Sequence, residues 1–187
     1  VGQSSFDACK PCPAGRYSID GTKQTSIGVC KRCVVGRYSE RIGQNSSFTC
    51  IACAGGRYSP GGDGQGLASA CKPCAPGKYS TDGKEQISQA VCKFCGAGRY
   101  SVSGEAQISV DVCVACEKGK YSSDGQGQTS EDVCKPCKVG TFANVVQEAV
   151  ADEDICDECP AGRYLDEEGT YNSVTGQGTT VSGFEYR

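Results

Sequence analysis

Eight Cys-x-x-Cys pairs recur along the 187 residues at an almost constant spacing. The step from one pair to the next is 20, 21 or 22 residues. A fixed period of this length is typical of a repeat architecture, in which short units complete their interiors only against their neighbours. The sequence therefore predicts an elongated tandem array of about eight units. The pairs are Cys9/Cys12, Cys30/Cys33, Cys50/Cys53, Cys71/Cys74, Cys92/Cys95, Cys113/Cys116, Cys134/Cys137 and Cys156/Cys159.

A second motif follows each pair. Three residues after the second cysteine comes a glycine, then usually a basic residue, an aromatic residue and often a serine. Two-residue alternation places the glycine and the aromatic residue on one face of a short strand, and the basic residue and the serine on the other. We therefore expect each aromatic ring to point inward as the small core of its repeat. These residues are Tyr17, Tyr38, Tyr58, Tyr79, Tyr100, Tyr121, Phe142 and Tyr164.

Turn chemistry separates the strands that we expect. Asp-Gly and Gly-rich stretches follow the motif, and no segment keeps a 3.6-residue apolar period. The predicted fold is small, disulfide-rich and β, with two short strands per 21-residue unit and little or no helix. Its divisions are 1–8 (the closing half of a repeat), 9–29, 30–49, 50–70, 71–91, 92–112, 113–133 and 134–155 (repeats 1 to 7), and 156–187 (a terminal incomplete repeat and tail).

The composition places this array in an oxidising compartment. The chain has 16 cysteines and 26 glycines, but no methionine, tryptophan or histidine. Cysteine-dense chains of this kind are secreted scaffolds in which cross-links replace apolar burial. We expect an extracellular or cell-surface location, and a mature or excised part of a secreted precursor. The sequence has no apolar run long enough to cross a bilayer.

Composition and motifs also argue against several function classes. The net charge of −3, without a polybasic run, argues against nucleic acid as a partner. The absence of histidine removes the commonest general base, and no phosphate loop or nucleophile elbow is present. We therefore expect neither enzymatic activity nor a cofactor.

The repeat unit resembles the ephrin-receptor-like cysteine-rich repeats, which are related in pattern to growth-factor-receptor and tumour-necrosis-factor-receptor modules. The stretches CKPCPAGRYS (9–18) and CKPCAPGKYS (71–80) carry this resemblance, which extends over about residues 9–164. Similar arrays occur in surface and filament proteins of protists. The resemblance implies an extracellular location, disulfides and a β-rich ladder, but no ligand. Tumour-necrosis-factor-receptor modules usually carry six cysteines; the two per unit here favour a uniform strut.

Two simple disulfide connectivities are open. Each Cys-x-x-Cys pair closes on itself, or the second cysteine of one pair joins the first of the next. The second arrangement resembles the closure of the receptor modules, and each bridge would contribute about 3 kcal/mol through loop closure. A zinc ribbon shares this spacing, but the equivalent gaps and the absence of histidine argue against it. The second arrangement gives Cys12–Cys30, Cys33–Cys50, Cys53–Cys71, Cys74–Cys92, Cys95–Cys113, Cys116–Cys134 and Cys137–Cys156.

That arrangement leaves Cys9 and Cys159 unpaired. Residues 1–9 match the closing half of a repeat at 42–50, and 159–168 match an opening half. One hypothesis is that subunits meet head to tail, with a Cys159–Cys9 disulfide between copies, and build a filament. The alternative is that both ends were cut from a longer array.

Two surface features complete the expected partners. Asn45 lies in the only N-glycosylation sequon, and the many serines and threonines are candidates for O-glycans. The recurring basic residue forms either a solvated mixed-charge face or a stripe for lateral docking of one rod on another. The leading hypothesis is therefore a self-assembling extracellular structural protein. Its alternative is the ligand-binding ectodomain of a receptor or adhesin.

Overall fold

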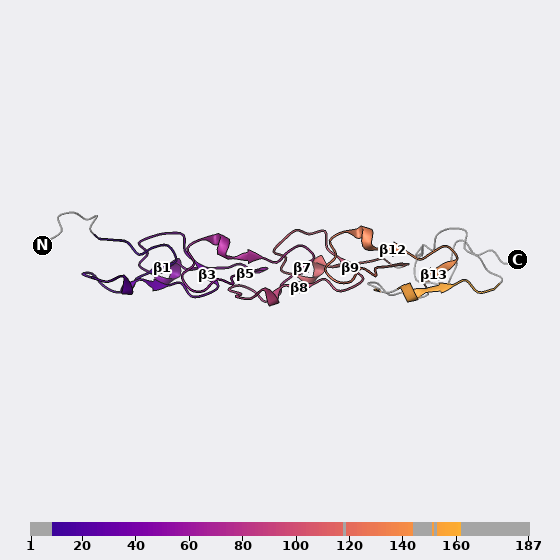
Figure 1. Cartoon of the computed structure of the whole chain (residues 1–187), viewed down its shortest axis with the longest axis horizontal. Coiled ribbons are helices and arrows are strands. Elements are labelled where there is room, and N and C mark those ends of the chain that lie inside the picture. The colour runs from indigo at the N-terminus through magenta and orange to yellow at the C-terminus, as the bar shows by residue number, and fades with distance from the viewer. Residues whose placement is uncertain (1–8, 118, 144–150, 152, 162–187) are drawn as a thin grey trace, which may run out of the picture. The chain divides into compact units, whose positions relative to one another are not determined.

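A computed structural model describes residues 9–117, 119–143, 151 and 153–161. Very short strands alternate with single 3-10 helical turns along this part of the chain (Figure 1). The strands are β1 (Arg16–Tyr17), β2 (Lys31–Arg32), β3 (Arg37–Tyr38), β4 (Ile51–Ala52), β5 (Arg57–Tyr58), β6 (Lys72–Pro73), β7 (Lys78–Tyr79), β8 (Lys93–Phe94), β9 (Arg99–Tyr100), β10 (Val114–Ala115), β11 (Lys120–Tyr121), β12 (Lys135–Pro136), β13 (Thr141–Ala143) and β14 (Cys156–Glu158).

The strands pair as two-stranded sheets, and the described residues form seven of them. The first strand of each sheet comes from the basic–aromatic motif, and the second contains the residues that follow the first cysteine of the next pair. In β1–β2 the partners are antiparallel, with Arg16 opposite Arg32 and Tyr17 opposite Lys31. The sheets are β1–β2, β3–β4, β5–β6, β7–β8, β9–β10, β11–β12 and β13–β14. The prediction of disulfide-rich β repeats with two short strands is confirmed.

Seven disulfides clamp these sheets, and each joins the second cysteine of one pair to the first of the next. Each closed loop therefore holds one motif strand, and the bridge lies beside the pairing with the following strand. The Cα–Cα distances of 5.3–5.6 Å are ordinary for disulfides. The bridges are Cys12–Cys30, Cys33–Cys50, Cys53–Cys71, Cys74–Cys92, Cys95–Cys113, Cys116–Cys134 and Cys137–Cys156.

The core of the described chain consists of cystine sulfur and small side chains. Second cysteines such as Cys33 and Cys95 are fully buried, and in five repeats the motif serine is at most 2% exposed, whereas Ser18 is half-buried. The expectation that serine shares the outer face with the basic residue is therefore wrong. A motif strand is only two residues long, so its alternation ends at the tyrosine and does not determine where the serine points. The buried serines are Ser39, Ser59, Ser80, Ser101 and Ser122.

The motif rings are less buried than an inward-facing core requires. Tyr121 is 7% exposed, but the rings of the five preceding repeats and Phe142 are half-buried. Apart from Tyr121, they are therefore not fully buried core residues. Tyr164, along with the segments 1–8 and 162–187, lies outside the described residues.

A 3-10 turn precedes the first cysteine of each pair from Cys30 on, a feature that periodicity alone did not reveal. In five of these turns a serine four residues before the cysteine caps the N-terminus; Ser26, for example, accepts a hydrogen bond from the amide of Gly28. At Leu67, which has no cap oxygen, Glu40 of the preceding repeat accepts from the neighbouring amide of Ala68, at 3.0 Å. The turns are η2 (Ile27–Val29), η3 (Ser47–Thr49), η4 (Ala68–Ala70), η5 (Gln89–Val91), η6 (Val110–Val112), η7 (Glu131–Val133) and η8 (Glu153–Ile155).

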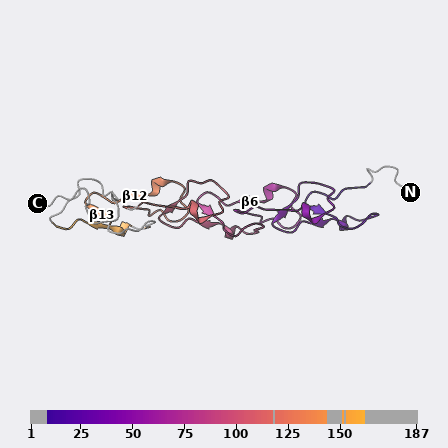
Figure 2. The same cartoon turned by 180° about the vertical axis from the view of Figure 1, so that it is seen from behind.

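The chain divides into two compact units. Unit 1 holds residues 9–75, 80–93 and 105–108, and unit 2 holds 76–79, 94–104 and the described residues from 109 on. Figures 1 and 2 show strands β12 and β13 of unit 2 from opposite sides. Neither unit contains a helix longer than one 3-10 turn in its described part.

Candidate functional site

The backbone edge that each repeat offers to the next is the most regular feature of the molecule. In five repeats the amide of the motif serine donates to the carbonyl oxygen of a glutamine in the following repeat, at 2.8–3.0 Å. The adjacent tyrosine forms a parallel bridge with that glutamine in several repeats, for example Tyr17 with Gln44. The serine–glutamine bonds are Ser18–Gln44, Ser39–Gln65, Ser59–Gln86 and Ser80–Gln107 in unit 1, and Ser101–Gln128 in unit 2.

A second backbone bond joins the same repeats. A loop amide just before the glutamine donates to the carbonyl oxygen of the second cysteine in the preceding repeat, at 2.7–3.0 Å. In these five repeats the motif strand is therefore paired on both sides, by the next Cys-x-x-Cys segment and by the loop of the next repeat. These bonds are Gly43–Cys12, Gly64–Cys33, Glu85–Cys53 and Ala106–Cys74 in unit 1, and Gly127–Cys95 in unit 2.

The glutamine is a functional position that sequence analysis missed. It stands six residues before the first cysteine in repeat after repeat. Its side-chain amide donates to a carbonyl of its own loop, as from Gln44 to Ile42 and from Gln65 to Gly62, both at 2.9 Å. This bond closes the turn that presents the glutamine carbonyl to the preceding serine. The signal was the repetition itself, at Gln24, Gln44, Gln65, Gln86, Gln107 and Gln128.

Contacts also reach the next repeat but one. A Cβ on the motif glycine would lie 2.1–2.5 Å from a backbone carbonyl oxygen two repeats further along. These glycines have φ between +72° and +83°, a left-handed region that L side chains rarely adopt. Only glycine meets both conditions. The pairs are Gly15 with Gly64, Gly36 with Glu85 and Gly56 with Ala106 in unit 1, and Gly77 with Gly127 in unit 2.

The motif arginines hold the end of the 3-10 turn. Their Nη1 donates at 2.9–3.1 Å to the carbonyl oxygen of the first cysteine of the next pair. The two lysines at this position make other contacts: Lys78 Nζ lies 3.9 Å from the centroid of the Phe94 ring, and Lys120 pairs with Glu117 at 3.3 Å. The arginine bonds are Arg16–Cys30, Arg37–Cys50, Arg57–Cys71 and Arg99–Cys113.

The acidic residues that follow the motif in sequence also form ion pairs within the chain. Each contacts the lysine that follows a first cysteine, at 3.5–3.9 Å between half-exposed side chains. The hydrogen bond from Lys138 to Glu153 raises the pKa of Lys138 in the same region of unit 2. These pairs favour a solvated mixed-charge face, and lateral docking stays a prediction. The acid–lysine pairs are Asp20–Lys31, Asp82–Lys93 and Asp124–Lys135.

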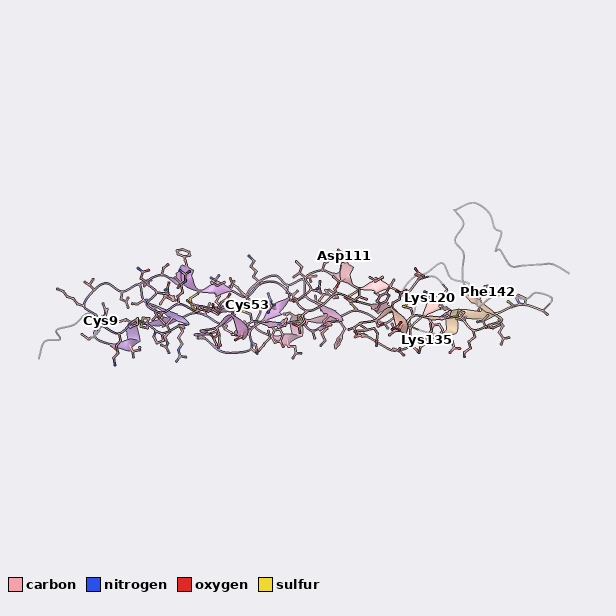
Figure 3. All side chains as sticks on the ribbon, turned by 90° about the horizontal axis from the view of Figure 1, so that it is seen from above. Cys9, Cys53, Asp111, Lys120, Lys135 and Phe142 are labelled. Atoms are coloured by element: carbon pink, nitrogen blue, oxygen red, sulfur yellow. A yellow bond between two sulfur atoms is a disulfide. The ribbon has the colours of Figure 1, made fainter. Side chains whose placement is uncertain are left out.

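Two thiols stand apart from this network, at Cys9 and Cys159. Cys9 is exposed and carries no bridge (Figure 3). Cys159 is half-buried, and its amide donates to the carbonyl oxygen of Gly140 at 3.0 Å. Every bridged second cysteine from Cys33 to Cys137 donates in the same way to the preceding motif glycine. Cys159 is thus held as a second cysteine whose sulfur lacks its usual partner.

The disulfides bear directly on the zinc alternative. A zinc ribbon needs four thiolates from two adjacent pairs, but here a bridge joins each pair to the next. Within the described ranges no group of three or more potential ligand residues is placed to hold a metal ion. The helical turns in those ranges are all too short to span a bilayer.

The fold and its bonding define the class of this protein. It is a tandem array of cysteine-rich repeats, joined by regular disulfides and by backbone hydrogen bonds between successive repeats. Seven disulfides are the chemistry of an oxidising compartment, consistent with a secreted or extracellular chain. No protein-family model matches the sequence, and no curated protein matches it either.

Proposed function

We propose that this chain is a non-catalytic structural protein of the extracellular space that assembles head to tail. The bond from Cys159 to Gly140 carries the proposal, because it seats the unbridged thiol in the register of the six bridged second cysteines before it. In each of those repeats the sulfur bonds the first cysteine of a following pair. Cys9 is a first cysteine, exposed and unbridged.

The N-terminal edge supplies the backbone half of the joint. Lys10 and Pro11 follow Cys9 as Lys72 and Pro73 follow Cys71, yet they are exposed and belong to none of the described strands. In β6 the Lys-Pro dipeptide pairs with the motif strand β5, so proline at this position is compatible with pairing. The first pair thus presents an edge to which a motif strand can bind.

The C-terminal sequence supplies that strand. Residues 159–164 read CPAGRY, identical to residues 12–17, which include β1 and the bridged Cys12. Residues 12–17 bind the next Cys-x-x-Cys segment through a disulfide and an antiparallel pair. Equal sequences favour equal pairing, so 159–164 of one copy would bind residues 9–12 of another. This contact does not close on itself and generates a filament.

Refolding the full chain, residues 1–187, under oxidising conditions in a glutathione buffer tests the proposal. Non-reducing electrophoresis should show a ladder of multimers that collapses on reduction, and peptide mapping should find Cys9 linked to Cys159. The C9S/C159S variant should stay monomeric with its seven internal bridges intact. C9S alone should likewise form no covalent multimers, because every joint needs the Cys9 of one copy and the Cys159 of another.

Two results would overturn the proposal. One is an oxidised chain that remains monomeric at high concentration. The other is a set of multimers joined by random pairs such as Cys9–Cys9. A monomer that binds a separate extracellular partner would favour the ectodomain alternative.

We also propose that Asn45 carries an N-glycan that covers Phe48. Asn45 is exposed just before η3, and Ser46 of the sequon caps that turn. Phe48 is 95% exposed, although the other repeats have glycine, alanine, serine or aspartate at this position. The only sequon therefore lies in the only repeat with an aromatic residue there, and a sugar three residues away can shield the ring from water.

Expression in a eukaryotic secretory host tests this second proposal. Intact mass should fall on enzymatic removal of N-glycans, and N45Q should show no glycan. The deglycosylated chain should bind an apolar dye more strongly than the glycosylated chain, and F48S should abolish that difference. Absence of the glycan, or dye binding that is unchanged on its removal, would contradict the proposal.

A further inference from the structure

We infer that the array is a tension-bearing spacer whose extension is limited by its disulfides. The inference concerns a single chain and does not depend on end-to-end assembly. It follows from the order of the bridges: each disulfide leaves from the second cysteine of a pair and arrives at the first cysteine of the next pair.

The shortest covalent route along the chain therefore bypasses most of its residues. From Cys12 it crosses to Cys30, follows two residues to Cys33, crosses to Cys50, and continues in this way to Cys156. Only the four-residue Cys-x-x-Cys segments and the bridges lie on this route. The motif strand, the glutamine turn and the 3-10 turn of each repeat lie in the bypassed loop.

The bridge geometry sets how far each repeat can extend while its disulfides are intact. A bridge spans 5.3–5.6 Å between Cα atoms and closes a loop of 17–19 residues in sequence separation. Such a loop would extend to roughly 6 nm at about 3.6 Å per residue, and a Cys-x-x-Cys segment extends to only about 1.1 nm. Each repeat can thus lengthen to about 1.6 nm with its bridges intact, compared with about 7 nm when reduced.

The bypassed loops are protected from being stretched for the same reason. When the ends are pulled, load passes to the short covalent route before a bypassed loop is drawn straight. The close glycine contacts and the serine–glutamine bonds can break and re-form without lengthening the chain beyond this limit. A structure with little apolar burial can in this way limit its extension under tension through its disulfides.

Single-molecule force spectroscopy on the full chain tests the inference, with handles on both termini and C9S/C159S as the background so that one copy is held. With bridges oxidised, the stretch from Cys12 to Cys156 should extend to no more than about 10 nm. Adding a reductant under load should release successive steps of about 6 nm, and about 40 nm in total.

Two variants make the test specific. C74S/C92S removes one bridge and should add one step of about 6 nm to the oxidised chain. Gly56→Ala weakens the packing but leaves every bridge in place, so the length limit should not change. Steps of about 6 nm in the fully bridged chain would overturn the inference. So would a C74S/C92S chain that extends no further than its parent.

Discussion

The contact between a motif glycine and the repeat two positions ahead can be tested by three alanine substitutions in unit 1. Gly56 has φ +72°, and a Cβ there would lie 2.2 Å from the carbonyl oxygen of Ala106. Gly83 has φ +76° but no atom within 4 Å of its Cβ position, and Gly62 has neither constraint. The three positions therefore separate the cost of the backbone conformation from the cost of the close approach.

The expected magnitudes follow from these two costs. A left-handed conformation costs alanine about 1–2 kcal/mol, and forcing a methyl group into a packed contact costs about 1–3 kcal/mol more. Gly83→Ala should thus destabilise by about 1–2 kcal/mol and Gly56→Ala by about 2–5 kcal/mol. Gly62→Ala should be neutral or stabilise by up to about 1 kcal/mol, because it restricts the unfolded chain.

Hydrogen exchange gives a local readout of this effect. The amide of Ala106 donates to the carbonyl oxygen of Cys74 at 2.9 Å, on the loop that approaches Gly56. Gly56→Ala should accelerate exchange in residues 105–108 by at least about thirtyfold, since each 1.4 kcal/mol is a factor of about ten. Calorimetry of the oxidised proteins should rank the three variants in the same order. Equal effects of Gly56→Ala and Gly83→Ala would refute the close-contact argument.

Three further predictions concern side chains. Arg99→Gln should destabilise unit 2 by about 1.5–3 kcal/mol in denaturant unfolding, because the charged donor to the Cys113 carbonyl is lost. Ser101→Ala should cost little or stabilise, because the buried Ser101 Oγ has no hydrogen-bond partner among the described residues; a loss above about 1 kcal/mol would contradict this. A double-mutant cycle on Asp82 and Lys93 should give a coupling energy below about 1 kcal/mol that decreases with salt, since both side chains are half-exposed.

The sequence by itself determined the class of fold. Sixteen cysteines in pairs at a constant period, with few large apolar residues, leave covalent cross-links as the main source of stability. The motif glycine and its neighbours also predicted two short strands per repeat. Periodicity was sufficient for this prediction because the same local structure recurs from one repeat to the next.

Only the tertiary structure decided which atoms join the repeats. A two-residue strand cannot determine the direction of the next side chain, so the serine proved to be buried and the tyrosine to be half-buried. The recurring glutamine and the capping serine could be read in the sequence, but their roles could not. The glutamine bonds a serine about 26 residues away, and the capping serine acts within a turn whose type was not predicted. The motif glycine is required by a backbone two repeats ahead, as Gly56 is by Ala106. Such long-range contacts arise only when the repeats stack on one another, and for that reason no local sequence pattern specifies them.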